Sequence, residues 1–240
     1  MADDLLEEQI AYYRERAPEY DRWWHRTHQY ELPPEKQAMW HREVAEVEAL
    51  ADDWVLAGGA SPRVLEYASG TGLWTARLAP IASSVVAVDA APETIAINRS
   101  KLEAAGMADR VGFVEADAFA WQPPAGEFDV VFFSFWLSHV PPDLFDAFWA
   151  NVRRALRPGG RAILLDNRWN DGVYPSFERR PDEHDPVQVR TDLSSGATYR
   201  VVKLYYEPDE LEQRLAGLGW DAHVAATERF FLVGWATPRA

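Results

Sequence analysis

The central part of the chain, residues 60–167, alternates short apolar runs rich in β-branched residues with longer helix-forming runs. The apolar runs are RVLEYA, SVVAVDA, RVGFVEA, FDVVFFSF and RAILLDN, separated by runs such as APETIAINRSKLEAAG. Strands that are apolar at almost every position need cover on both faces, and crossover helices supply it. The pattern therefore predicts an α/β fold with a buried, mostly parallel sheet.

The flanking segments have different patterns. Residues 1–56 are predicted to be helical, because apolar and aromatic residues recur three and four apart, with a break at Pro33 and Pro34. After residue 167, the run VQVRTDLSSGATYRVVKLYYEP alternates as two strands around a Ser-Ser-Gly turn. We expect one domain with a helical cap (1–56), a cofactor-binding core (60–167), a hairpin flap (168–206) and a C-terminal helix with strands (207–240).

Composition narrows the class of protein. The 240 residues, 48% of them hydrophobic, suffice for one core. The absence of cysteine excludes disulfides, thiolate metal sites and a cysteine nucleophile. A net charge of −14 disfavours nucleic acid as a partner. No signal peptide or membrane span is expected, so we predict a cytoplasmic protein that acts on a small molecule. The sequence carries no signal for its oligomeric state.

The turn in VLEYASGTG, after the first strand, gathers small residues at Ala68, Gly70 and Gly72. Such residues let a ligand approach the backbone, and the following helix offers free N–H groups. A dinucleotide-binding turn requires a third glycine, and Thr75 stands at that position. S-adenosylmethionine, which has no phosphate, is the other cofactor that suits this turn. Glu66 at the strand end is then placed to meet its amino acid part.

The next two strands also end in acids. Asp89, followed by Ala90, closes the second strand, where a carboxylate can accept both ribose hydroxyls of either cofactor. Asp117 follows the third strand and can accept from the adenine amine, with the N–H groups of Ala118 and Phe119 near the ring edge. A dinucleotide site has no such requirement at the third strand, so Asp117 favours S-adenosylmethionine.

These segments resemble those of the class I S-adenosylmethionine-dependent methyltransferases over residues 60–167. The resemblance comprises VLEYASGTG, VVAVDAAPETI, VEADAFAW, FDVVFFSFWLSHVP and LRPGGRAILLD, in the family's order. It implies a Rossmann-like sheet of seven strands whose last strand, in ERFFLVGWAT, is antiparallel. Ala68 departs from the family pattern, which usually has glycine there, and we expect the loop to tolerate the extra methyl group.

A second resemblance, to small-metabolite members of this family, involves YYRERAPEYD and WLSHVP. It is nearest to the type that methylates phosphonates in dehydrophos biosynthesis. In such enzymes the N-terminal helices close over the cofactor. The resemblance implies that Tyr12, Tyr13, Tyr20 and Trp24 face the site, with Tyr20 on the cofactor and Tyr13 and Trp24 toward the substrate. The alternative for Tyr20 is a ring packed between helices.

The run SFWLSHV follows the fourth strand at the edge where cofactor and substrate must meet. Ser134 and Phe135 are predicted to contact the cofactor, and Trp136 the substrate. His139 is the candidate general base, because its unperturbed pKa lies near neutrality. The alternative is a structural histidine, and an acceptor that is already an anion needs no base.

The flap contains six cations. We predict that Arg168, Arg200 and Lys203 bind an anionic substrate, with Arg179, Arg180 and Arg190 as further members of the set; solvated charges on an exposed hairpin are the alternative. The acidic run DEHD at residues 182–185 has no second cluster, so no metal is expected.

The predicted function is S-adenosylmethionine-dependent methyl transfer to a small molecule, at an oxygen of a carboxylate, phosphonate or phenol, with S-adenosylhomocysteine as product. A small-molecule N-methyltransferase is the alternative. An NAD(P)-dependent oxidoreductase and a noncatalytic cofactor-binding protein are further alternatives. Stabilisation by S-adenosylhomocysteine or by a dinucleotide separates the two cofactor classes.

Overall fold

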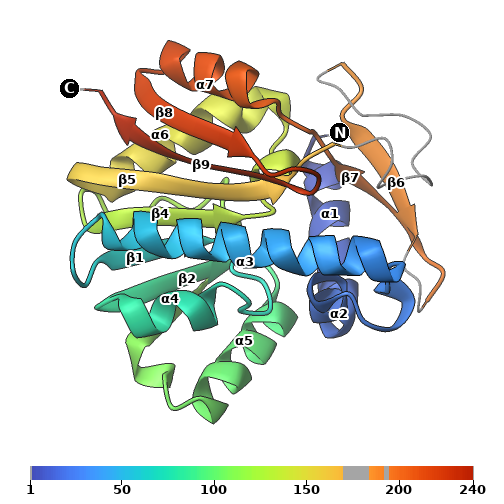
Figure 1. Ribbon diagram of the computed structural model, residues 1–240. Coiled ribbons are helices and arrows are strands. Elements are labelled where there is room, and N and C mark those ends of the chain that lie inside the picture. The colour runs from blue at the N-terminus through green and yellow to red at the C-terminus, as the bar shows by residue number, and fades with distance from the viewer. Residues whose placement is uncertain (1, 170–183, 192–194, 240) are drawn as a thin grey trace.

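The computed structural model describes residues 2–169, 184–191 and 195–239. Within them the strands form a seven-stranded sheet, flanked by helices, and a separate two-stranded sheet (Figure 1). The large sheet consists of β1 (Arg63–Tyr67), β2 (Ser84–Asp89), β3 (Val111–Glu115), β4 (Phe128–Ser134), β5 (Leu156–Asn167), β8 (Trp220–Ala226) and β9 (Phe231–Pro238). The helices are α1 (Ala2–Arg16), α2 (Tyr20–His25), α3 (Pro34–Leu56), α4 (Thr75–Ile81), α5 (Pro92–Ala104), α6 (Phe145–Ala155) and α7 (Pro208–Gly217).

The large sheet has the order β3-β2-β1-β4-β5-β9-β8. Strands β1 to β5 are parallel, while β9 is antiparallel to both of its neighbours, β5 and β8. The predicted α/β class, the seven strands and the antiparallel last strand are confirmed. The last strand lies inside the sheet, and β8 forms the edge.

Both faces of the sheet are buried, as the apolar strands required. Alternate residues of one strand point to opposite faces, so Val130 and Phe132 join one core cluster, while Val131 and Phe133 join the other. The first cluster is covered by α3, α4 and α5, and the second by α6 and α7. Figure 1 shows α3 crossing one face of the sheet.

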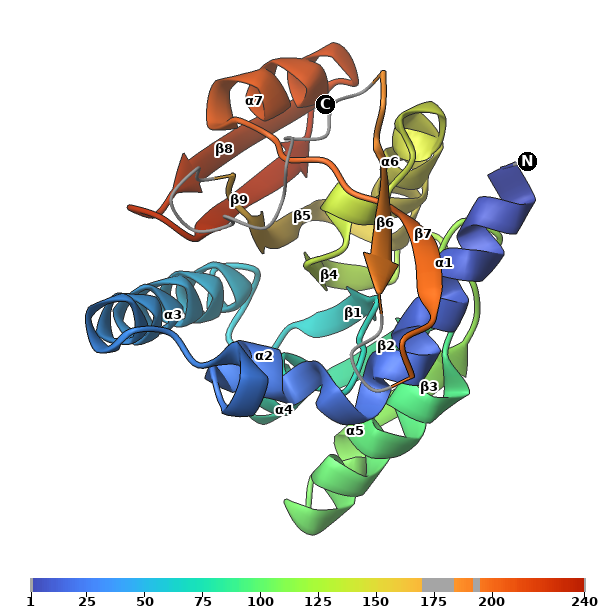
Figure 2. The same cartoon turned by 90° about the vertical axis from the view of Figure 1, so that its right-hand side faces the viewer.

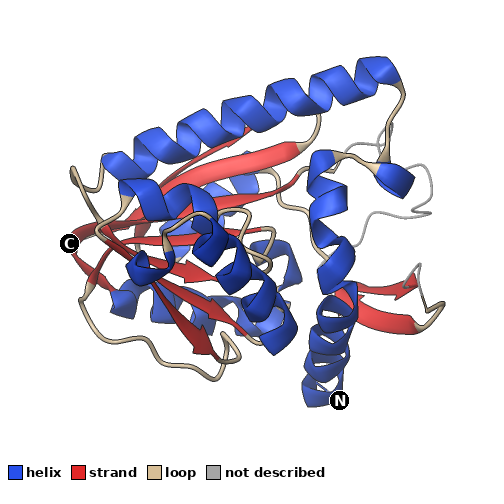
Figure 3. Ribbon diagram, turned by 90° about the horizontal axis from the view of Figure 1, so that it is seen from below, coloured by secondary structure: helices blue, strands red, loops and turns tan. Residues whose placement is uncertain are grey.

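The N-terminal segment is helical with one more break than predicted. A 3₁₀ turn at Ala17–Glu19 separates α1 from α2, and Pro18 within it has no N–H to continue an α-helix. Helix α2 ends at His25, and the next residue, Arg26, has a left-handed φ of 52°. Helix α3 begins at Pro34, as the paired prolines predicted. Helix α2 runs in a different direction from α1 (Figure 2), and the N-terminal helix lies beside the two short strands of the small sheet (Figure 3).

The small sheet pairs β6 (Val187–Thr191) with β7 (Thr198–Val202) in antiparallel register, as the alternating pattern predicted. The connecting residues 192–194 lie outside the described part of the chain. Helix α1 packs along β7, where the Arg200 amide donates to Glu8 (2.9 Å) and the Tyr199 hydroxyl donates to Glu15. Figure 2 shows α1 and β7 side by side. Together with α2 they lie at the end of the molecule toward which the parallel strands point (Figure 1).

Candidate active site

The loop between β1 and α4 is strongly bent. Ala68, Gly70 and Gly72 have φ values of 50°, 53° and 86°. This left-handed region is easy for glycine, but it costs a residue with a Cβ roughly 1 to 2 kcal/mol. Ala68 therefore occupies a strained position, which the surrounding fold enforces. Phe135, at the end of β4, has a φ of 51° and is strained in the same way.

Asp89, at the tip of β2, holds this loop in place. Its carboxylate accepts from the Gly70 amide (2.7 Å), the Ala91 amide (2.9 Å) and the Thr94 hydroxyl (2.9 Å). Burial raises the pKa of Asp89, while these hydrogen bonds lower it. The side chain is thus oriented before any ligand arrives.

Asp117 occupies the corresponding place after β3. One of its oxygens accepts from the Phe119 amide (2.9 Å), which fixes the turn that follows the strand. The Phe119 ring lies 5.2 Å from the Trp136 ring, and both side chains line the same cleft. An apolar slot with a carboxylate at its edge can hold a purine ring whose amine donates to that carboxylate.

These strand tips open into one cleft of about 1020 Å³, counting its mouth, which is the size of a small-molecule pocket. The predicted site residues that line it are Tyr13, Tyr20, Ala68, Gly70, Asp89, Ala90, Asp117, Ala118, Phe119, Ser134, Phe135, Trp136 and His139. Residues from five separate segments of the chain therefore meet in one place.

The sequence indicated Tyr13 of α1 but not its neighbours in the cleft wall. Leu6, Gln9, Ile10 and Ala17 line the cleft beside Tyr13. Their spacings of three and four residues place them on one face of a helix, and that periodicity was the available signal. Helix α2 is tied to the loop as well, because Asp21 accepts from the Thr71 hydroxyl (2.5 Å) and pairs with Lys101.

Glu66 and Gly72 lie behind the loop rather than in the cleft. The Glu66 carboxylate accepts from the Thr75 hydroxyl (2.6 Å), which in turn accepts from the Asn98 amide (2.8 Å). Burial raises the pKa of Glu66 to about 8, opposed by the Thr75 hydrogen bond. A Cβ on Gly72 would lie 2.2 Å from Asn98 Oδ1. The structure therefore gives both residues a place in the packing of the loop against α5.

Trp24 belongs to an aromatic cluster one layer behind the cleft. Its ring centroid is 5.9 Å from that of Trp40, 6.1 Å from Trp74 and 5.6 Å from Phe135. Its backbone carbonyl accepts from the Trp40 indole (2.9 Å). Trp74 and Phe135 line the cleft, and Trp24 supports them from behind.

Two of the predicted substrate cations point elsewhere. Arg168 donates to the backbone carbonyls of Thr227 (2.7 Å) and Glu228 (3.2 Å). Arg200 is exposed and makes an ion pair with Glu8 (2.7 Å), which lowers the pKa of Glu8 to about 2. Neither arginine lines the cleft. Arg179 and Arg180 lie outside the described residues.

Lys203 is buried close to the cleft. Its ammonium donates to the Ser138 hydroxyl (2.7 Å) and lies 3.5 Å from Asp166. Burial lowers the pKa of Lys203 to about 8, and Asp166 acts against that shift.

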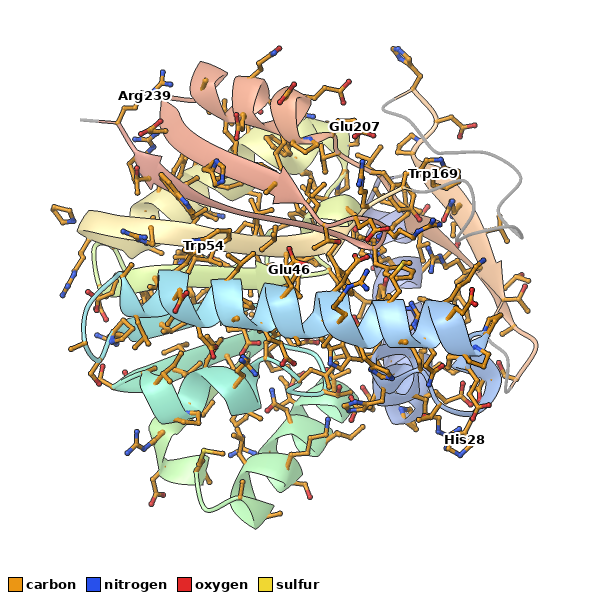
Figure 4. All side chains as sticks on the ribbon, viewed as in Figure 1. His28, Glu46, Trp54, Trp169, Glu207 and Arg239 are labelled. Carbon is orange, nitrogen blue, oxygen red and sulfur yellow. The ribbon has the colours of Figure 1, made fainter. Side chains whose placement is uncertain are left out.

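Trp169, which packs on Tyr205, lies on the side of the molecule that carries the β6–β7 hairpin (Figure 4).

His139 and Tyr13 form a hydrogen-bonded pair in the wall of the cleft. The Tyr13 hydroxyl is 2.7 Å from His139 Nε2, and His139 Nδ1 is 2.6 Å from the Val202 carbonyl. Gln9 fastens the same region, since it donates to the His139 carbonyl (3.2 Å) and accepts from the Val202 amide (2.9 Å). The pair thus joins α1, β7 and the turn after β4.

Arg16 and Arg190 are cations that lie near this pair. The Arg16 guanidinium is 5.5 to 5.7 Å from the ring centroids of Tyr12, Tyr20 and Tyr30. Arg190 stands opposite Tyr199 in the hairpin register, so both side chains leave the same face. Tyr199 packs on Tyr12 of α1 (5.8 Å), so that face is turned toward α1. Arg16 was missed because the rings around it come from three elements, α1, α2 and the 3₁₀ turn at His28–Tyr30.

The described residues contain neither a metal-binding cluster nor a membrane-spanning helix. Among residues 2–169, 184–191 and 195–239, no three His, Asp or Glu side chains are grouped so that they could hold a metal ion. Asp182 and Glu183 of the acidic run lie outside those ranges. None of the helices in the described part of the chain is long and apolar enough to cross a bilayer.

Comparison with known proteins identifies the family. Residues 64–160 match a family model described as a methyltransferase domain. The ubiquinone/menaquinone biosynthesis C-methyltransferase UbiE of Shewanella sp. (strain W3-18-1) is 31% identical over 175 residues, which cover 68% of each protein. The chain belongs to the class I S-adenosylmethionine-dependent methyltransferases.

Two solved structures resemble this methyltransferase over almost its whole length. The DhpI–SAH complex is 35% identical, with a TM-score of 0.75, and the match covers 100% of this chain and 99% of DhpI. The DhpI–SAM–HEP complex is 36% identical, with a TM-score of 0.74 and 98% coverage of both chains. The predicted cofactor, S-adenosylmethionine, is thereby confirmed, as is the assignment as an enzyme.

Proposed function

We propose that this methyltransferase transfers a methyl group to an oxygen of a small anionic acceptor, which is a carboxylate, a phosphonate or a phenolate. The observation that carries the proposal is a set of three cations, Arg16, Arg190 and Lys203, which do not line the cleft themselves but lie close to the Tyr13–His139 pair in its wall. Their charges act on His139, whose pKa is lowered well below its usual value by burial first and by these cations second. Three cations gathered in one place in a chain with a net charge of −14 are suited to attract an anion.

The chemistry of the cleft walls supports placing the cofactor there. We propose that Asp89 accepts from the ribose hydroxyls and that Asp117 accepts from the adenine amine, with Ala118 and Phe119 against the ring. The amino acid part then lies on the loop at Ala68 and Gly70. A Cβ at Gly70 would meet only the Ala68 carbonyl oxygen at 3.9 Å, so this surface is open to a ligand.

The three cations differ in how they are held, and this affects their proposed roles. Arg16 donates to the Tyr12 hydroxyl (3.2 Å) and is otherwise surrounded by aromatic rings, so its planar fork is suited to an oxyanion. Lys203 is held by Ser138 and Asp166 and contributes mainly charge. Arg190 lies on the hairpin face that is turned toward α1. We therefore propose that Arg16 and Arg190 bind the anionic substrate, in place of Arg168 and Arg200, which were predicted to do so from the sequence.

Alignment supplies most of the proposed catalysis. S-adenosylmethionine provides a methyl group on a positively charged sulfur, so the electrophile is already activated. An anionic acceptor needs no deprotonation. Holding two reactants in attack geometry lowers a barrier by roughly 7 to 11 kcal/mol, more than a single positioned base supplies. The residues of the cleft therefore act by binding, orienting and excluding water.

The test is a screen of small acids with methyl-labelled S-adenosylmethionine. Carboxylic acids, phosphonates and phenols are compared with amines of similar size, and esters or ethers are the expected products. Arg16→Gln is expected to raise KM for the active acid by roughly 10-fold, since a hydrogen bond to a charged group is lost. The control is Arg14→Gln, two residues away on the same helix, where the arginine pairs with Glu93 at the surface. Methyl transfer to amines alone would refute the proposal.

C-methylation is the second candidate, and N-methylation remains a third. The 31% identity to a protein named as a C-methyltransferase favours the second. Transfer to carbon requires that the acceptor lose a proton from that carbon, and therefore a base. The screen separates these candidates directly, because NMR of the product distinguishes a methyl group on carbon, nitrogen or oxygen.

A further inference from the structure

The hydrogen-bond directions at Tyr13 and His139 follow from which atoms can donate. A backbone carbonyl can only accept, so His139 Nδ1, 2.6 Å from the Val202 carbonyl oxygen, carries a hydrogen. In a neutral imidazole the other nitrogen has none. Nε2 therefore accepts from the Tyr13 hydroxyl at 2.7 Å. Each ring nitrogen has one protein partner.

Burial and charge keep the ring neutral. His139 is only 4% exposed, and Lys203, Arg190 and Arg16 all disfavour an added positive charge, so its pKa lies well below the usual value. Burial also raises the pKa of Tyr13, which keeps its hydroxyl protonated. The Tyr13 proton is thus committed to His139. The lone pairs of the Tyr13 oxygen remain for the cleft, which both residues line.

This arrangement does not suit His139 as a general base. A proton from an acceptor would have to displace the Tyr13 hydroxyl or pass through it to Nε2. It would then form an imidazolium ion beside Lys203, whose ammonium is held in place by Ser138 (2.7 Å). Like charges at such a site are strongly unfavourable in a low-dielectric environment.

We infer that Tyr13 is the catalytic residue that contacts the methyl donor through its hydroxyl oxygen, and that His139 is a positioning residue that fixes the direction of that hydroxyl. An oxygen that offers only lone pairs attracts a positive sulfonium and the polarised hydrogens of its methyl group. S-adenosylhomocysteine has neither feature. The inference rests on the proposed placement of the cofactor in the cleft, and it does not depend on the acceptor.

The preference for S-adenosylmethionine over S-adenosylhomocysteine tests the role of Tyr13, with calorimetric titration as the measurement. Tyr13→Phe keeps the ring and its packing on Tyr12 and His139 but removes the oxygen. We expect affinity for S-adenosylmethionine to fall roughly 5- to 10-fold and affinity for S-adenosylhomocysteine to stay within about twofold. Equal changes for both ligands, or no change, would overturn the inference.

The control is Tyr67→Phe, which should leave both affinities unchanged. Tyr67 is fully buried, its hydroxyl has no hydrogen-bond partner among the described residues, and it does not line the cleft. If neither cofactor form binds the unmodified enzyme, the placement of the cofactor fails instead. A cofactor preference as expected together with an inactive acid screen would refute only the proposed acceptor.

Two substitutions at His139 separate positioning from base catalysis. Glutamine places an amide near the position of Nε2, where it can accept from Tyr13, but it cannot take up a proton. Asparagine reaches only the position of Nδ1 and keeps the bond to the Val202 carbonyl. We expect His139→Gln to retain the cofactor preference within about twofold and His139→Asn to lower it to the level of Tyr13→Phe, with no further loss in the double variant.

The same variants are then assayed on an acid found by the screen. His139→Gln is expected to keep kcat within roughly threefold, whereas His139→Asn and Tyr13→Phe lose about 10-fold, without a change in the pH profile above pH 6. If glutamine abolishes turnover as completely as asparagine while the cofactor preference is unchanged, His139 is the base and the inference is wrong.

Discussion

The two halves of the cleft are held together by different kinds of contact. In the half proposed to bind the cofactor (the cofactor half, residues 66–119), short acidic side chains on strand tips accept from backbone amides of neighbouring loops, as Asp89 does from Gly70 (2.7 Å). In the acceptor half, formed by α1, β7 and residues 137–139, long side chains connect elements far apart in the chain. Gln9 reaches the Val202 amide across 193 positions.

This difference has a physical consequence. Parallel strands bring their carboxyl ends to one edge of the sheet, so the cofactor half is fixed by the same hydrogen bonds that build the fold. The acceptor half depends on side chains that must be ordered when α1 packs on β7, at an entropic cost for each. We expect perturbations of the cofactor half to have the larger effects.

Loss of the Asp89 carboxylate should have the largest effect. In Asp89→Ala the ribose loses its acceptor, and the Gly70 and Ala91 amides lose theirs. Two lost hydrogen bonds to a charged group amount to about 3 kcal/mol, so the Kd for S-adenosylhomocysteine should rise roughly 100-fold or more in calorimetry. The control is Asp109→Ala, because Asp109 is an exposed acid that follows α5. Binding within threefold of the unmodified enzyme would remove Asp89 from the site.

A methyl group at Gly72 should rank next. In Gly72→Ala the new Cβ meets Asn98 Oδ1 at 2.2 Å, in a backbone conformation with φ of 86°. We expect a loss of about 3 kcal/mol in the free energy of unfolding, measured with urea. Gly106→Ala has a φ of 69° and nothing within 4 Å of the new Cβ, so it should cost only about 1 kcal/mol. Equal losses would show that the contact with Asn98 is easily relieved.

Glu66→Gln should stabilise the enzyme, and more so at high pH. Burial raises the folded pKa of Glu66 to about 8 from 4.5, so the folded state keeps a proton that the unfolded state releases. The contribution of Glu66 is therefore full below about pH 4.5 and is lost as pH rises through 8. The glutamine avoids that loss, so thermal unfolding should show a gain in stability that is largest above pH 8 and shrinks toward pH 5. The control is Glu103→Gln, because Glu103 is exposed. A gain in stability that does not change with pH, or one equal to that of the control, would contradict this role of Glu66.

The acceptor half should respond locally and less strongly. Gln9→Ala removes the partner of the Val202 amide and of the His139 carbonyl, at a cost of about 1 kcal/mol each. Hydrogen exchange at Val202 should become roughly 10-fold faster, while the Val88 amide of β2 keeps its rate. Exposed Glu7→Ala serves as the control. Equal acceleration at Val88 would show that the two halves open together.

The sequence predicted which strand-tip acids of the cofactor half lie at the cleft, because the signals are local. Asp89 and Asp117 each follow an apolar strand directly, and the structure brings both to the cleft. Glu66 satisfies the same rule, yet the structure turns it toward Thr75 (2.6 Å). The sequence shows where a residue lies on a strand. The direction in which its side-chain carboxylate points is set by neighbours from other segments of the chain.

The acceptor half was harder to predict for the same reason. Six flap cations looked alike in the sequence, yet Arg200 pairs with Glu8 at the surface and Arg168 donates to backbone carbonyls. Lys203 is buried instead beside Asp166 (3.5 Å). Arg16, near the Tyr13–His139 pair, lies in a segment whose helical face was recognised but whose partner was unknown.

The sequence alone determined the layered fold, the order of its strands along the chain and the acids at the strand tips. These follow from hydrophobic periodicity and turn residues, which act over a few positions. Only the tertiary structure decided which cations surround the Tyr13–His139 pair and which way the Tyr13 hydroxyl points. Hydrogen-bond direction and the surroundings of a charge depend on atoms that meet only when α1, β7 and the turn after β4 pack together.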